Sequence, residues 1–139
     1  MPDINLSSSM EDYIKTIYQL ENLNKVARVS DIGRKLSVKK ASVVAAVSFL
    51  QKNELIKHER YGFITLTERG KEIASNIDRK NTLVHAFLSN MLKIDAEKAK
   101  EEACLIEHSI SDETAGKLAA FMKANKPAVV KKTVKKGKK

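Results

Sequence analysis

The chain has 139 residues, 42% apolar and 31% charged, which predicts a soluble globular protein with one modest core or two small lobes. No run reaches the roughly 18 apolar residues that a membrane helix needs, the first residues lack a signal-peptide pattern, and the single cysteine fits a reducing cytoplasm. The net charge is +9, and nine basic against three acidic residues within 25–60 favour a phosphate-backbone partner, although a solvated basic surface would carry the same charge.

The N-terminal residues predict two helices. Serines 7–9 are suitable caps for a first helix, and apolar residues follow them at helical spacing: Met10, Tyr13, Ile14, Ile17 and Leu20. After an extended segment, Ser30 is expected to cap a short helix over 31–37. Gly33 costs this helix up to about 1 kcal/mol relative to Ala, so we interpret it as a point of close helix packing.

The next segments predict a third helix and a β-hairpin. Residues 39–54 place Val43, Val47 and Leu50 on one apolar stripe, which indicates a helix of about four turns. Two β-prone runs, 55–58 and 63–66, then flank a turn that contains Gly62.

The remaining residues predict three helices and a tail. Thr67 should cap a long helix, whose apolar residues share one side: Ile73, Ile77, Val84, Phe87 and Met91. Asp95 should start the next helix and Ser111 the last one, whose apolar face is Leu118, Phe121 and Met122. Residues 126–139 contain seven lysines and no acid, so we expect a disordered tail that adds non-specific affinity for a polyanion.

A helix, a short helix, a turn, a third helix and a hairpin form the order of a winged helix-turn-helix. In that fold the third helix enters the major groove of DNA and the hairpin lies against phosphates. The residues predicted to contact DNA are Arg28, Lys39, Lys40, Ala41, Ser42, Val44, Ala45 and Arg60. The alternative is that 39–54 is a core helix with basic ends.

Cys104, Glu107 and His108 form a candidate metal site on the helix that follows Asp95. The apolar stripe of that helix is Ala99, Ala103, Ile106 and Ile110, which leaves Glu107 half-buried at its edge. A divalent cation would neutralise this carboxylate. Alternatively, Cys104 is an ordinary buried cysteine and Glu107 pairs with a lysine. A Cys–His nucleophile pair would need an orienting group and an oxyanion loop, and neither is near.

Four segments, SMEDYIKTIYQL, ARVSDIGRKLSV, LTERGKEIA and EEACLIEHSISDE, occur in an order that resembles the diphtheria toxin repressor family of metal-dependent transcriptional regulators. The resemblance covers about residues 6–124. The chain is similar in length to the short manganese-transport regulators of this family, which lack the C-terminal SH3-like domain of the longer members. The iron branch takes its primary metal ligands from the first helix and a Cys-x-x-Glu-His run, which implies Asp12, Cys104, Glu107 and His108 here.

The departures from this family bear on the metal. The manganese branch has Glu in place of Cys104, a second Glu in place of Lys15 and His in place of Asn81. The ancillary site of the iron branch has His, Glu and His at the positions of Asn81, His85 and Lys100, so neither second-metal set is intact. The resemblance therefore implies one ion per subunit. The thiolate favours Fe²⁺, with Mn²⁺ second because Asp12 is a hard ligand.

We therefore expect a mainly α protein, with a winged helix-turn-helix DNA-binding domain over 1–71 and a helical metal-binding and dimerisation domain over 72–125. The expected function is a cytoplasmic, homodimeric repressor of metal-homeostasis genes that binds a palindromic double-stranded DNA operator when loaded with metal. It is expected to be neither an enzyme nor a receptor for a small-molecule substrate. The alternatives are a metal-independent winged-helix regulator with Cys104 as a core or redox-sensing residue, and a basic architectural DNA-binding protein.

Overall fold

The structure, a computed structural model, describes residues 5–24, 27–59 and 62–125. The predicted wing residue Arg60 and the predicted tail, 126–139, lie outside these ranges. The chain divides into two compact units, the first ending at Asp78 and the second beginning at Arg79. The sequence interpretation placed the boundary after residue 71, whereas the division between the units falls within one continuous helix, α4 (Glu68–Ala86).

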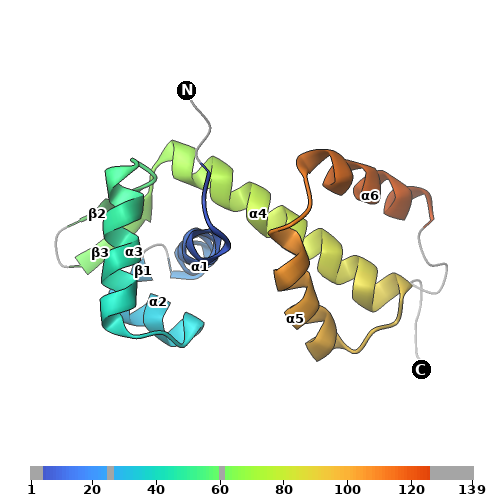
Figure 1. Cartoon of the computed structure of the whole chain (residues 1–139), viewed down its shortest axis with the longest axis horizontal. Coiled ribbons are helices and arrows are strands. Elements are labelled where there is room, and N and C mark those ends of the chain that lie inside the picture. Colours follow the sequence, from blue (N-terminus) through green and yellow to red (C-terminus); the bar gives the residue numbers. More distant parts are fainter. Residues whose placement is uncertain (1–4, 25–26, 60–61, 126–139) are drawn as a thin grey trace. The chain divides into compact units, whose positions relative to one another are not determined.

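The first unit begins with three helices, α1 (Ser8–Asn24), α2 (Val29–Leu36) and α3 (Lys40–Lys52) (Figure 1). The Oγ of Ser7 accepts a hydrogen bond from the Met10 amide at 3.2 Å, which satisfies one of the unpaired amides at the start of α1. The predicted cap of α2 is wrong by two residues. Arg28, with extended backbone, occupies the N-cap position, and Ser30 lies within the first turn. Strand pairing holds residues 27–28 in an extended conformation, so α2 starts directly after them and before the capping side chain of Ser30.

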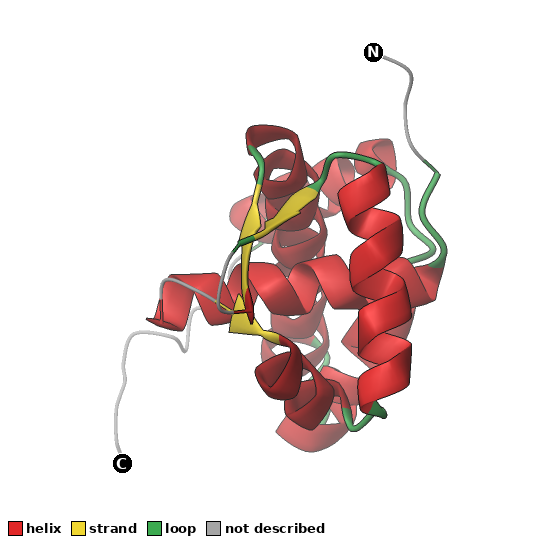
Figure 2. Cartoon of the chain, turned by 90° about the vertical axis from the view of Figure 1, so that its left-hand side faces the viewer, coloured by secondary structure: helices red, strands yellow, loops and turns green. Residues whose placement is uncertain are grey.

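Three short strands pack beside these helices (Figure 2). β2 (Ile56–His58) and β3 (Phe63–Leu66) form the predicted antiparallel hairpin. The extended segment before α2 adds a third strand, β1 (Ala27–Arg28), on the other edge of β3, so the strand order is β1-β3-β2. The segment that was expected only as a link therefore pairs the start of α2 with the β2–β3 hairpin, which is the wing of this fold.

The core of the first unit follows the predicted apolar periodicity. α1 contributes Ile14 and Ile17, α2 contributes Ile32 and α3 contributes Val43 and Leu50, all of them fully buried. Each such side chain stabilises the fold by about 1.5–3 kcal/mol relative to leaving it exposed.

Two glycines permit close approaches in this unit. A Cβ at Gly33 would lie 3.2 Å from the Val38 carbonyl oxygen, which supports the interpretation of Gly33 as a point of close packing. At Gly70 an added Cβ would overlap the carbonyl oxygen of Leu55. Gly70 lies in the first turn of α4, where its amide donates to the Oγ1 of the predicted cap residue Thr67 at 3.0 Å. Glycine at position 70 thus lets α4 start directly against the segment that leads into β2.

The second unit is built from the C-terminal part of α4, a π-helical segment η2 (Phe87–Met91), α5 (Ala96–Glu107) and α6 (Asp112–Ala124). The long helix predicted through Met91 therefore changes to π-helical geometry after Ala86. The apolar stripe of α4 is shared between two cores, because Ile77 belongs to the first, whereas Val84 packs in the second with Leu88, Ala99 and Ala103. The architecture is thus mainly α: a winged helix-turn-helix followed by a small helical unit.

Candidate functional site

The helix α5 presents three potential metal ligands on its last two turns. Asp95 starts this helix as predicted, since its carboxylate accepts hydrogen bonds from the amides of Glu97 and Lys98. Ala99 and Ala103 are fully buried in the core of the second unit, which fixes the rotation of α5 about its axis. The following polar residues are thereby directed to the neighbouring side of the helix. They are Cys104, Glu107 and the C-cap residue His108.

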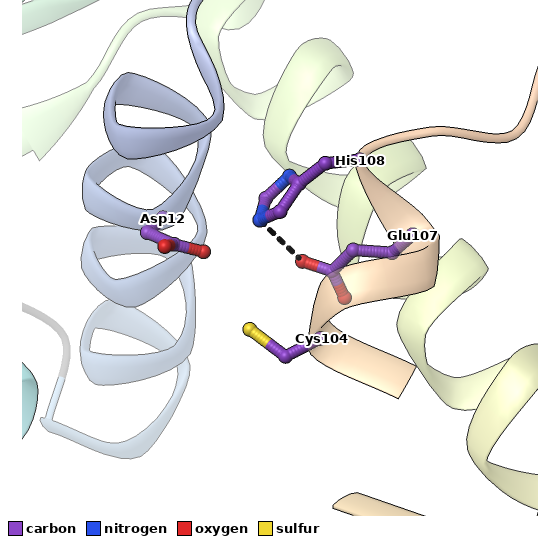
Figure 3. A group of neighbouring side chains, drawn as sticks. All are labelled: Asp12, Cys104, Glu107 and His108. Atoms are coloured by element: carbon purple, nitrogen blue, oxygen red, sulfur yellow. Dashed lines mark ion pairs between the residues drawn. The ribbon is translucent and has the colours of Figure 1, made fainter. Parts of the chain in front are cut away.

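The donor atoms of these three residues gather in one place. The Cys104 sulfur, a Glu107 carboxylate oxygen and a His108 ring nitrogen all lie within 4.8 Å of one another, and Figure 3 shows the three side chains pointing the same way. The Nε2 of His108 lies 3.6 Å from the Oε2 of Glu107. The Glu107 residue is only 3% exposed, so the prediction that it is half-buried was wrong. The helical angle predicts the direction in which the Glu107 side chain points, but its exposed fraction depends on the elements packed around it.

The chemistry of this cluster fits a divalent transition ion. A thiolate, a carboxylate and an imidazole are the donor types that such ions take in proteins, and two of the three can carry negative charge. The cluster also occupies the C-terminal end of α5, where the helix dipole favours a cation, and the last turn of α5 contains no basic residue of its own. The three residues present are therefore able to hold a metal ion.

The fourth predicted ligand, Asp12, belongs to the first unit and is the remaining residue labelled in Figure 3. Asp12 lies near the start of α1 and is partly buried. Lys15, less than one turn further along the same helix, is only 8% exposed. α1 therefore carries the carboxylates of Glu11 and Asp12 and the ammonium group of Lys15 within about one turn.

The predicted DNA-contacting residues at the start of α3 lie on its exposed side. Buried positions 43, 46, 47 and 50 face the core. The exposed residues of this stretch are those named from the sequence: Lys39, Lys40, Ala41, Ser42, Val44 and Ala45. Neither Lys39 nor Arg28, the N-cap residues of α3 and α2, makes a side-chain capping hydrogen bond. No side chain at these two N-cap positions therefore satisfies the first amides of either helix, although the Ser42 amide donates to the Lys39 carbonyl oxygen at 3.0 Å.

A groove of about 580 Å³ lies between these two helix starts and the wing. It is lined by Arg28, Val29, Ser30, Gly33, Arg34, Val38, Lys40 and Gly62. Arg28 is held in place because its guanidinium lies 4.6 Å from the centre of the Phe63 ring on β3. Sequence reasoning did not single out Arg34, whose position on the groove depends on the packing of α2 beside α3.

The residues predicted for dimerisation lie on α6 and differ in exposure. Leu118 packs partly against the core of its own unit, Met122 is partly buried, and Phe121 is 52% exposed. Leu105 on α5, which was not among the residues predicted for dimerisation, is 71% exposed.

Comparisons with known proteins match both units. Residues 5–63 match the N-terminal DNA binding domain of iron dependent repressors, and residues 67–128 match their metal binding and dimerisation domain. An uncharacterised HTH-type transcriptional regulator of Methanocaldococcus jannaschii is 34% identical over 89% of this chain and 100% of its own length. The transcriptional regulator MntR of Bacillus subtilis is 39% identical over 74% of this chain and 72% of its own.

A solved structure of the manganese regulator SloR is 33% identical, with a TM-score of 0.74 over 86% of this chain. The present chain spans 55% of that protein. No helix among the described residues is both long and apolar enough to cross a membrane.

The fold and the matched domains define the class of protein, a metal-dependent transcriptional regulator with a DNA-binding and a dimerisation domain, and not an enzyme. The chain belongs to the diphtheria toxin repressor family.

Proposed function

We propose that this protein is a cytoplasmic, homodimeric repressor whose binding to a palindromic DNA operator requires one divalent transition ion per subunit. The genes it controls would be those of metal homeostasis. One observation carries the proposal: the donor atoms of Cys104, Glu107 and His108 gather within 4.8 Å of one another on the last turns of α5. Asp12 is the fourth ligand in this proposal.

The DNA-binding part of the proposal rests on α3, the wing and the groove between them. Lys39 and Lys40 bring two positive charges to the start of α3, where small residues allow close approach to base edges. Arg28, Arg34 and Lys40 line the groove, which suits a phosphate of the DNA backbone. Such contacts position the helix, while Ser42, Val44 and Ala45 are available to distinguish bases.

The metal would act by linking the two units. Asp12 lies on α1, a helix of the DNA-binding unit, and the other three ligands lie at the end of α5. An ion bound by all four residues favours those arrangements of the units in which the four ligands meet. In a homodimer this would shift the population toward one spacing of the two α3 helices, and a palindromic operator recognises such a spacing. The dimer contact is assigned to Leu118, Phe121 and Met122 on α6.

Iron(II) is the favoured ion in this proposal and manganese(II) the second. The thiolate of Cys104 is a softer donor than oxygen, and affinities for divalent ions generally rise from Mn²⁺ to Fe²⁺. The manganese regulator SloR, at 33% identity, supports Mn²⁺ as the second choice. Lys15 on α1 adds a positive charge close to Asp12, which favours a single ion over two.

Operator binding in the presence and absence of metal tests the proposal. A DNA site is first selected from a random pool with the metal-loaded protein. Binding to that site is then titrated under anaerobic, reducing conditions with Fe²⁺, Mn²⁺ or a chelator. We expect tight binding only with metal, and a stoichiometry of one ion per subunit. Equal affinity with the chelator would disprove metal control, and two ions per subunit would disprove the single site.

A further inference from the structure

Lys80 of α4 is fastened to the turn between α5 and α6. Its side chain is only 13% exposed, and its Nζ donates a hydrogen bond to the Ile110 carbonyl oxygen at 3.0 Å. The same Nζ lies 3.0 Å from the Oδ1 of Asp112. All three residues belong to the second unit. One ammonium group thus connects α4 to both ends of the segment 110–112.

This segment directly follows the metal ligands. α5 ends at Glu107 and His108 is its C-cap, after which the amides of Ser109 and Ile110 both donate to the Ile106 carbonyl, at 2.9 and 3.2 Å. The last carbonyls of a helix have no partner within the helix, and such ends fray unless other groups bind them. Two of the three ligands on α5 therefore lie where the helix needs outside support.

Lys80 provides that support in two ways. It satisfies a carbonyl just beyond the last turn of α5, and it places a positive charge at a helix end whose last turn has no basic residue. The Asp112 side chain is 74% exposed, so the shielded part of this contact is the partly buried hydrogen bond from Lys80 to the Ile110 carbonyl. That hydrogen bond holds its geometry better than an exposed pair such as Lys117 with Glu113, whose side chains are 80% and 79% exposed.

We propose that Lys80 is a positioning residue of the metal centre. By holding Ile110 and Asp112, it keeps the end of α5 in the geometry that gathers the donor atoms of Glu107 and His108 beside Cys104. This inference rests on the proposed function, because it concerns the affinity of that same site. The opposite electrostatic expectation is clear: if Lys80 acted only through its charge, it would repel the ion, and its removal would tighten binding.

The test measures metal affinity directly on the full chain. Co²⁺ is titrated anaerobically into the wild type, Lys80→Met, Lys80→Gln and Lys80→Arg, with the thiolate-to-cobalt absorption as the signal. Lys117→Met is the matched control, since it removes an exposed lysine from α6. Thermal unfolding of the metal-free proteins is recorded in parallel. Lys80→Gln remains polar, so it serves if Lys80→Met does not fold.

We expect Lys80→Met and Lys80→Gln to weaken Co²⁺ binding about tenfold, the lower end of the effect of losing an outer partner of a metal site. Lys80→Arg, which retains a donor and the charge, should recover most of the affinity, and Lys117→Met should match the wild type. Unchanged or tighter binding by the folded Met and Gln variants would overturn the inference. A wild type that gives no thiolate–cobalt signal would instead overturn the proposed metal centre, and this inference with it.

Discussion

His108 Nε2 lies 3.6 Å from Glu107 Oε2, so two consecutive residues at the end of α5 direct an imidazole and a carboxylate to the same point. The Glu107 side chain is fully buried and that of His108 is only 10% exposed. Consecutive helical residues project about 100° apart, and His108, the C-cap, keeps helical backbone angles, so the two side chains turn toward each other from different directions. Both side chains would serve as ligands if a divalent ion were held here.

Glu107→Gln should separate metal binding from folding. The amide has the same shape but supplies no negative charge, so we expect a folded protein that binds metal poorly. Metal at about 100 times its Kd stabilises a protein by about 2.7 kcal/mol, and we expect most of this gain to be absent in Glu107→Gln. Thermal unfolding with and without Mn²⁺ measures it. Glu101→Gln, at an exposed position of α5, is the control and should respond as the wild type does.

Cys104→Ala should lose the iron response before the manganese response. The thiolate contributes more to Fe²⁺ than to the harder Mn²⁺. We expect at least a tenfold higher Fe²⁺ concentration for half-maximal operator binding, on the order of the effect of disturbing a metal site. Anaerobic operator titrations with each ion provide the comparison, and Cys104→Ser tests whether oxygen at this position restores Mn²⁺. If Mn²⁺ activated operator binding at a lower concentration than Fe²⁺, and Cys104→Ala changed neither concentration, Cys104 would not be a metal ligand.

Lys39→Ala with Lys40→Ala should weaken operator binding and flatten its dependence on salt. Each phosphate contact contributes about 0.9 to the slope of log K against log salt, and a homodimer would lose four such contacts, so the slope for the double variant should fall by about 3.6. Lys52→Ala, at the opposite end of α3, is the matched control. Ser42→Ala should alter the preference among operator variants instead. An unchanged slope in the double variant would show that the start of α3 does not face the DNA backbone.

Arg34→Gln should weaken binding to all DNA sequences by a similar factor, because Arg34 lines the groove beside α3 and the wing. We expect the salt slope to fall by about 1.8, as for one lost phosphate contact in each subunit of the homodimer. Lys35→Gln makes the same change in net charge on the neighbouring residue, which is exposed and is not part of the groove lining. If both variants behaved alike, the effect would reflect overall charge and not the groove.

Gly70→Ala should destabilise the first unit by about 1–3 kcal/mol, the usual cost of overpacking. The added methyl would overlap the Leu55 carbonyl oxygen, and relief requires α4 to move away from the segment before β2. Gly116→Ala is the control. No atom lies within 4 Å of a Cβ at this position of α6, and alanine is the better helix former by up to about 1 kcal/mol. The midpoint of chemical denaturation should therefore fall for Gly70→Ala and rise for Gly116→Ala.

Local patterns in the sequence determined most helices and grouped the three candidate ligands at the end of α5, whereas Asp12 was assigned only by the family resemblance. Asp95, Ser111 and Thr67 start their helices as predicted, because a cap depends only on residues two or three positions away. The stripe of Ala99 and Ala103 likewise identified the buried side of α5, since helical spacing alone relates these residues.

Tertiary structure decided what depends on pairing between distant segments. Ala27 and Arg28 are a strand because β3 lies beside them, and this pairing places the N-cap of α2 at Arg28, two residues before the capping side chain of Ser30. Arg34 lines the groove because α2 packs beside α3, and Lys80 contacts Ile110 because α4 packs beside the turn after α5. No pattern of neighbouring residues predicts either packing. The complete burial of the Glu107 side chain has the same origin, because the helical angle determines a direction whereas depth depends on every element packed around it.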